Sequence, residues 1–270
     1  VSTYDVDRVL DPEQPLSDEV LSSVSLCTSF VVFDVTQPPF DDLNVRQAFV
    51  MAVDRQQYID VLLSGVGLPA EGLYPPALPG HNPDLEGLPY DPEAARRLLA
   101  QSRYRGPAGL PPIVFTSGGI GNDASPSVAA LVQMWEQNLG VSITVENLEP
   151  DLYYDLCYGG QHGQIVTSGW CADYPDPENF ADALFRTGAQ QNLGNYSNPD
   201  LDALLDRARI EQDVARRIEL YQQAEQIIVQ DAPAVFLVHS ISYVLVKPYV
   251  QGYVLTPIDI PLERYLWVER

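Results

Sequence analysis

The sequence predicts an α/β fold in which helices pack on a mixed β-sheet. Short apolar runs rich in β-branched and aromatic residues alternate with longer segments whose apolar residues recur every three or four positions. The first pattern is typical of buried strands and the second of amphipathic helices. Their alternation, followed by a late cluster of helices and a tail of strand-like pieces, favours a sheet flanked by helices.

Elements of the amino-terminal half follow from local patterns. Residues 16–22 have a short helical pattern, and residues 28–35 form an apolar, β-branched run that predicts a strand. A single helix is expected over residues 44–64, with Asp42 or Asn44 as its cap. The Pro- and Gly-rich stretch 67–89 is too long for a simple turn, so we expect a functional surface loop or a packed wrapper.

The rest of the chain alternates between the two element types. Further helices are expected where an apolar face follows a capping residue: 91–102, 125–139, 150–158, 176–185, 199–210 and 213–230. Further strands are expected at 113–117, 141–147 and 164–170. Residues 234–239 and 242–247 are interpreted as a hairpin around Ser240-Ile241, and a short strand piece is expected at 265–268.

Composition and charge exclude several classes of protein. Hydrophobic residues make up 46% of the 270 residues and charged residues 19%, which allows a sizeable core. The net charge of −22 disfavours binding to nucleic acid or anionic membranes. No apolar run reaches the roughly 18 residues of a membrane span. Residues 1–25 are acidic and contain Pro12 and Pro15, unlike a signal peptide. A visible signal peptide would be missing both from a cytosolic protein and from a trimmed chain, so this feature does not distinguish the two.

Enzyme chemistry is not expected. The sequence has no GxSxG, P-loop or HExxH motif, and its three histidines are scattered, so neither a metal nor a cofactor is predicted. Gly118-Gly119-Ile120-Gly121 lacks phosphate-loop spacing, which favours a flexible turn. Nothing in the sequence orients Cys157 and His162 as a catalytic pair, so a half-buried structural role is favoured for Cys157.

The unusual segment is SGWCADYPDP, residues 168–177. It begins at the end of an expected strand, where α/β proteins place ligands, and it combines an aromatic ring with a carboxylate. An ammonium group could pair with Asp173 while an apolar group packs on Trp170. From the residues alone, a core role for Trp170 and a turn role for Asp173 are favoured.

Three blocks of sequence carry a resemblance to a known family. They are residues 39–70, with PFDD, VRQA and AVDR; residues 75–99, with YDPEAA; and residues 169–233, with GWCADYPDP and NYSNP. In order and spacing, over about residues 26–270, the chain resembles the extracellular solute-binding proteins of family 5, which include oligopeptide-, dipeptide- and nickel-binding proteins.

The resemblance implies a two-lobed protein that closes on its ligand by hinge motion. This chain would supply mainly the carboxy-terminal lobe, a periplasmic-binding-protein-like (type II) lobe. Residues 29–245 would form that lobe, whereas residues 1–28 and 246–270 would belong to the other lobe.

The resemblance also implies roles for particular residues. Asp173 would bind the free α-amino group of a peptide, and Trp170 would line a side-chain pocket, with Cys171, Phe30 and Val32 also near the ligand. Thr167 stands where oligopeptide-binding relatives carry a basic residue for the peptide carboxylate, so anchoring of the carboxy terminus is not expected.

The pairing of the three cysteines is open from the sequence alone. The resemblance implies a Cys27–Cys171 disulfide with Cys157 left free, and such a bond implies an oxidising, extracytoplasmic location.

The expected function is therefore the substrate-binding component of an ABC importer, in the periplasm or as a membrane-anchored lipoprotein. Its partners would be a peptide or another small solute and the permease subunits, with no nucleic acid, and it would be a monomer. The alternative is a ligand-sensing domain of a regulatory protein with the same fold. A peptide hydrolase is disfavoured, because neither a nucleophile–base pair nor a metal set is visible.

Overall fold

A computed structural model describes residues 1–2, 5–119, 124–258, 260 and 263–269. Its centre is a six-stranded sheet in the order β2-β6-β1-β5-β3-β4. These strands are β1 (Val20–Phe33), β2 (Leu68–Pro69), β3 (Ile113–Gly118), β4 (Ile143–Leu148), β5 (Ile165–Cys171) and β6 (Ala234–Leu245). Strand β3 runs parallel to β4 and β5, whereas β1 is antiparallel to β5 and β6, which confirms the mixed sheet.

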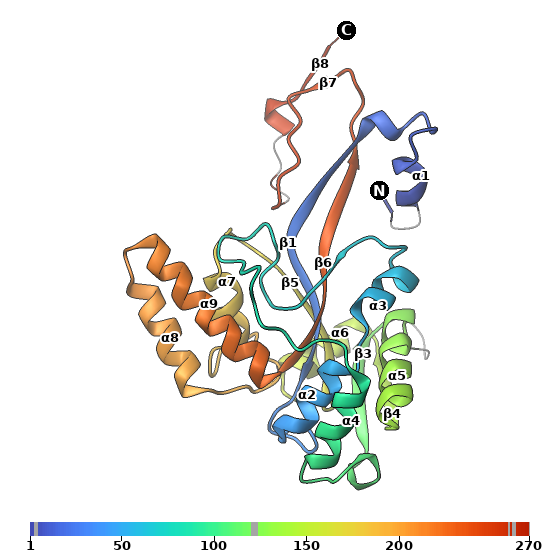
Figure 1. The fold of residues 1–270 in the computed structure, drawn as a ribbon. Helices are drawn as coiled ribbons and strands as arrows, with labels where there is room; N and C mark the ends of the chain where they lie inside the picture. Colours follow the sequence, from blue (N-terminus) through green and yellow to red (C-terminus); the bar gives the residue numbers. More distant parts are fainter. Residues whose placement is uncertain (3–4, 120–123, 259, 261–262, 270) are drawn as a thin grey trace.

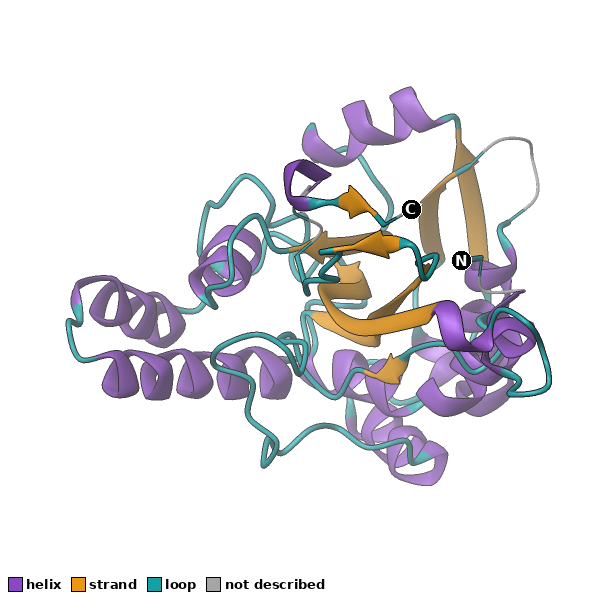
Figure 2. Ribbon diagram, turned by 90° about the horizontal axis from the view of Figure 1, so that it is seen from above, coloured by secondary structure: helices purple, strands orange, loops and turns teal. Residues whose placement is uncertain are grey.

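Helices cover both faces of this sheet (Figures 1 and 2). The helices in the described residues are α1 (Val6–Leu10), α2 (Leu43–Met51), α3 (Arg55–Leu62), α4 (Pro92–Gln101), α5 (Pro126–Leu139), α6 (Pro150–Tyr158), α7 (Glu178–Phe185), α8 (Pro199–Ile210) and α9 (Val214–Asp231). Of these, α1 contributes no residue to either cluster of core residues on the two faces of the sheet. Short 3-10 turns lie at Ser17–Glu19, Pro107–Gly109 and Glu263–Tyr265, and β7 (Val250–Gln251) pairs with β8 (Trp267–Val268). The expected helices from 91 onward are confirmed to within a few residues at each end.

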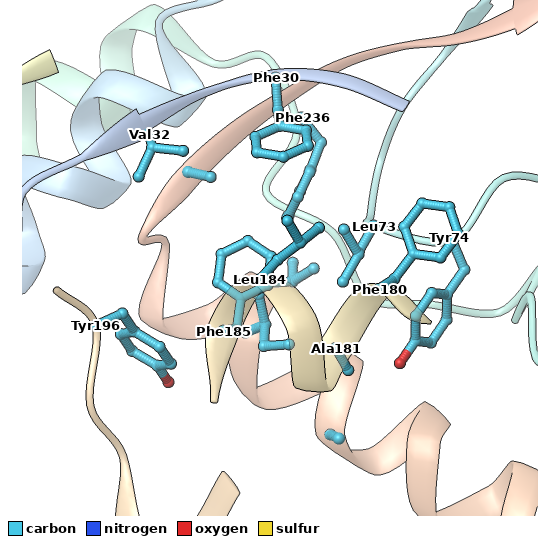
Figure 3. Close-up of a cluster of buried hydrophobic side chains, with 14 of the residues drawn as sticks. Phe30, Val32, Leu73, Tyr74, Phe180, Ala181, Leu184, Phe185, Tyr196 and Phe236 are labelled. Atoms are coloured by element: carbon cyan, nitrogen blue, oxygen red, sulfur yellow. The ribbon is translucent and has the colours of Figure 1, made fainter. Parts of the chain in front are cut away.

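Period-two alternation along β1 divides the core into two clusters. Phe30 and Val32 point into one cluster, with α7, α8 and α9, whereas Val31 and Phe33 point into the other, with α2 to α5. In the first cluster the ring of Phe30 lies 6.4 Å from that of Phe185 and 5.9 Å from that of Phe236 (Figure 3). The sheet is therefore buried on both faces, and β1 and β6 have continuous apolar runs where they lie between the two core clusters.

Strands β1 and β6 are longer than the local patterns indicate. The expected hairpin at Ser240-Ile241 is wrong: β6 is one strand from Ala234 to Leu245, and β1 already begins at Val20. The reason is tertiary, because residues 20–24 pair with residues 241–245 and each segment satisfies the backbone of the other. This two-stranded extension leads away from the body toward the segments that contain both termini (Figure 1).

The single helix expected over 44–64 is also wrong, because it is divided into α2 and α3. Asp54 is extended and its side chain accepts the Gln57 N–H, so it caps a new helix. Carbonyl groups released at the break are bonded from α5: Trp135 Nε1 donates to Phe49 O at 2.9 Å, and Asn138 Nδ2 donates to Ala52 O at 2.8 Å. These long-range donors are invisible to a local pattern.

The stretch 67–89 is a packed wrapper, one of the two expectations for it. Its residues Ala70, Leu73 and Tyr74 are buried in the first core cluster. The buried carboxylate of Glu225 on α9 accepts the backbone N–H groups of Leu73 and Tyr74, both at 2.8 Å. Of the glycine-rich turn considered for phosphate binding, residues 120 and 121 lie outside the described residues.

Candidate functional site

Strand β5 has one edge without a strand neighbour over its second half. On one side, residues 165–171 pair with β1 along their whole length. On the other side, β3 pairs only with Ile165 and Val166. Within the described part of the chain, Thr167 O on this side accepts the Tyr153 hydroxyl, and the backbone of residues 168–171 presents an open edge on the β3 side.

Two hydrogen bonds identify the backbone groups that face this edge. Asp34 N–H donates to Gln164 O and Ala172 N–H donates to Leu26 O, so the even-numbered positions of β5 point toward β1. The backbone N–H and C=O groups of successive residues in a strand point to opposite edges. Those of Gly169 and Cys171 therefore point toward the open edge. An extended ligand could add itself there as a strand.

Asp173 follows this edge and is exposed to solvent. Its orientation is set by Asn179 of α7, a buried side chain. Asn179 Oδ1 accepts the Asp173 N–H at 2.9 Å, and Asn179 Nδ2 donates to Asp173 Oδ2 at 3.3 Å. These bonds leave the other carboxylate oxygen of Asp173 available for an ammonium group.

The same asparagine holds Trp170. The indole Nε1 donates to Asn179 Oδ1 at 3.0 Å, and the half-buried ring packs against the first core cluster. Asn179 therefore joins the two residues that the sequence singled out, and sequence reasoning did not identify it. One feature of the sequence could have indicated Asn179: it is a polar residue on the otherwise apolar face of the helix that follows the motif.

An ion pair fastens the turn after Asp173. Arg217 on α9 contacts Asp176 through two bonds, at 2.7 and 2.8 Å, and its guanidinium group lies 4.9 Å from the centre of the Tyr221 ring. Asp176 also accepts the Glu178 N–H at the start of α7. A bidentate pair of this kind fixes geometry as well as adding stability, so the turn is held against α9.

The disulfide expectation is confirmed. Cys27 of β1 and Cys171 of β5 are directly opposite in the strand register and are bonded, which closes a sequence separation of 144 residues. Cys157 is free and buried, and this burial raises the pKa of its thiol. A cavity of about 630 Å³ beside the bridge is lined by the long strands and by residues 255–258.

Two of the expected ligand residues lie in the core. Phe30 is 2% exposed and Val32 is 6% exposed, and both pack in the first cluster. These positions give them a packing role, and a ligand role for them stays a prediction. The structure thus brings Asp173, Trp170 and Cys171 together at the surface end of β5, with Phe30 and Val32 beneath.

Two further features concern metal binding and membrane insertion. No group of His, Cys, Asp and Glu side chains in the part of the chain that the structure describes is arranged to hold a metal ion. None of the helices in that part of the chain has the length and apolar character that crossing a bilayer requires.

Comparison with known proteins supports the family resemblance. The sequence model of "Bacterial extracellular solute-binding proteins, family 5 Middle" matches residues 5–192. The "Dipeptide-binding protein" of Escherichia coli is 30% identical over 249 residues, which cover 91% of this chain and 46% of that protein. "Heme-binding protein A" of Haemophilus influenzae is 29% identical, over 88% of this chain and 44% of that protein.

A solved structure agrees with these sequence matches. The structure of Haemophilus influenzae OppA in complex with RPPGFSPFR is 25% identical, with a TM-score of 0.80 over 99% of this chain and 53% of that one. The chain spans about half the length of the curated relatives that it matches. Because the family model matches more than half of this sequence, the chain belongs to the bacterial extracellular solute-binding proteins of family 5.

Proposed function

We propose that this chain forms the carboxy-terminal lobe of a peptide-binding protein that serves an ABC importer outside the cytoplasm. One observation carries the proposal: the exposed carboxylate of Asp173 lies next to the open edge of β5. That arrangement suits an extended peptide whose ammonium end pairs with Asp173 and whose backbone bonds to Gly169 and Cys171.

Several of the relatives support a peptide as the ligand, although one is named for heme binding. One is named a dipeptide-binding protein, and a structural neighbour holds the peptide RPPGFSPFR. The Cys27–Cys171 bond supports an oxidising, extracytoplasmic location and disfavours a cytosolic sensor. In this proposal the partners are a peptide and the permease subunits, and the protein acts as a monomer.

The proposal includes a division between lobes. Residues 29–245 form the lobe described above, whereas residues 1–28 and 246–270 contribute to the second lobe. The long pair β1 and β6 supports this division, since it joins the body to the segments at both ends (Figure 1). In the register of this pair, shifts occur between Val24 and Thr28 and between Ser29 and Phe30, close to the proposed boundary.

The test is the substitution Asp173→Asn in the protein expressed from its complete gene. Removing one partner of a desolvated ion pair costs about 3–5 kcal/mol, so peptides with a free amino end should bind at least about 100-fold more weakly. N-acetylated peptides should be unaffected. Calorimetry with both peptide sets measures the difference.

The exposed Asp84→Asn change is the matched control, because it alters the net charge by the same amount at a remote site. Equal weakening of free and blocked peptides by Asp173→Asn would assign Asp173 a structural role and remove the main support for the proposal.

A further inference from the structure

A pocket of about 310 Å³ lies beside the open edge of β5. Its floor and walls come from α6, from the backbone end of β5 and from Leu193 of the loop between α7 and α8. The lining residues are Tyr153, Tyr154, Cys157, Tyr158, Thr167, Ser168, Gly169 and Leu193. The pocket therefore adjoins Gly169, one of the two residues whose backbone faces the proposed ligand.

The tyrosines of α6 form an aromatic wall that is held in place. Tyr154 and Tyr158 stack with their ring centres 6.4 Å apart and their planes 11° apart. The hydroxyl of Tyr153 donates to Thr167 O, and the hydroxyl of Tyr158 donates to Gln191 at 2.9 Å. Tyr154 is 57% exposed and Tyr158 is 49% exposed, so a large apolar area faces solvent next to the site. Packing a flat, apolar group against these rings would remove that area from water.

The lack of charged side chains in the pocket limits the kinds of group that it can bind. None of the described residues that line it is an Arg, Lys, His, Asp or Glu. A neighbouring pocket of about 360 Å³ shares Cys157, Tyr158 and Leu193, and its described lining is also uncharged. A ligand carboxylate placed here would lose water without gaining a cation, and the net charge of −22 would repel it. An uncharged aromatic group matches both the rings and the absence of charge.

We propose that this pocket is a subsite for an uncharged aromatic side chain of the bound peptide. The inference rests on the proposed function, because Asp173 sets the position of the amino end. Gly169 lies four residues before Asp173, a span of at most roughly 13 Å because β5 ends at Cys171, so the pocket receives the third or fourth residue of the peptide. The substrate class is a short peptide with a free amino end and Phe or Tyr at one of these positions.

The test measures binding of tetrapeptide amides to the protein expressed from its complete gene. The probes are Ala-Ala-Ala-Ala, Ala-Ala-Phe-Ala, Ala-Ala-Ala-Phe and the two analogues with Glu in place of Phe. We expect Phe at position three or four to improve the dissociation constant at least tenfold over Ala, and Glu at the same position to weaken it.

Variants of Tyr154 assign this preference to the pocket. Tyr154 is exposed, so its replacement should leave the fold intact. Tyr154→Ala should abolish the gain from Phe, Tyr154→Phe should keep it, and Tyr154→Arg should favour the Glu peptide. Tyr90→Ala, at another exposed tyrosine, is the matched control and should keep the gain.

The outcomes separate the two proposals. If the all-Ala peptide binds through its free amino end but Phe brings no gain, or the gain survives Tyr154→Ala, the subsite is overturned and the proposed function stands. If none of the peptides binds, the proposed function is overturned, and the subsite with it.

Discussion

Asn179 shows how one buried polar side chain can organise the surface of the candidate site. It is 5% exposed and bonds to both Trp170 and Asp173, so it couples the aromatic residue to the carboxylate. The two N–H donors that meet at its Oδ1 also fix the orientation of its amide group. Sequence reasoning identified the two residues that touch the surface and missed the residue between them, because spacing within a motif does not reveal which side chains turn inward.

A second buried residue, Glu225, makes stability depend on pH. Burial raises the pKa of its carboxyl group to about 8, although the N–H groups of Leu73 and Tyr74 act in the opposite direction. Among the described residues, Oε2 has no hydrogen-bond partner. Between pH 4.5, the ordinary value, and about 8, the folded protein thus holds a proton that the unfolded chain has released. Stability from this group falls as pH rises through that window.

His239 contributes with the opposite sign over a lower range. Burial, with a smaller effect of His81, lowers the pKa of His239 from 6.5 to about 3. The unfolded chain therefore binds more protons between these values, and stability rises with pH there. Thr28 Oγ1 donates to Leu73 O, so the His239 Nδ1 that contacts it at 2.9 Å is the protonated nitrogen. Above pH 6.5 the effect of Glu225 is no longer offset by this histidine.

We therefore predict that Glu225→Gln flattens the pH dependence of stability between pH 6.5 and 8. One proton over that interval corresponds to about 2 kcal/mol of unfolding free energy that the wild type loses and the variant keeps. Urea unfolding at pH 6.5, 7.25 and 8 measures it. The exposed Glu219→Gln on the same helix is the control. Parallel pH profiles for wild type and Glu225→Gln would contradict the assignment.

At the scale of elements, the disulfide joins the two strands that support the site. Cys27 and Cys171 lie on β1 and β5, at the point where β5 leaves the sheet for the turn that contains Asp173. The bond closes a loop of 144 residues, which would otherwise be free to expand in the unfolded chain. Its effect on stability is consequently larger than that of most single contacts.

The double substitution Cys27→Ala and Cys171→Ala is predicted to lower the unfolding free energy by up to about 5 kcal/mol, the chain-entropy value for a loop of this length. Urea unfolding without reductant measures the loss. Reductant should lower the midpoint of the wild type toward that of the double variant and leave the variant unchanged. A wild-type midpoint that does not move after both thiols titrate as reduced would refute this prediction.

At the scale of the whole molecule, the open edge of β5 and the exposed Asp173 form one wall of the proposed site. The chain spans about half the length of its curated relatives, and in our proposal the opposite wall comes from the second lobe. Exclusion of water from the Asp173 ion pair then depends on closure of both walls, since the carboxylate is exposed on this lobe alone.

Residues 1–270 expressed alone are therefore predicted to fold but to bind tripeptides weakly. The apolar cores on both faces of the sheet support independent folding. An ion pair that stays solvated contributes about 0–1 kcal/mol instead of about 3–5 kcal/mol, so affinities should be at least about 30-fold below those of the complete protein. Calorimetry with a tripeptide library provides the comparison. Submicromolar binding by this chain alone would show that a single wall suffices.

The sequence by itself determined the fold class and the later helices, and it predicted where the candidate site lies. Helices α8 and α9 each begin after a capping residue, Asn198 and Asp213. The apolar residues of each helix recur every three or four positions, so the local sequence is enough to predict them. The family motif placed Trp170 and Asp173 at a strand end and paired Cys27 with Cys171, and the bond is present.

Tertiary structure alone decided the features that depend on contacts between distant segments. The unbroken β6, the early start of β1, the division between α2 and α3 and the inward position of Asn179 each rest on a partner from another part of the chain. Backbone groups and buried polar atoms must find partners wherever the fold places them. A local pattern shows which residues are apolar, but it does not show which distant group will bond to a given backbone or buried polar atom.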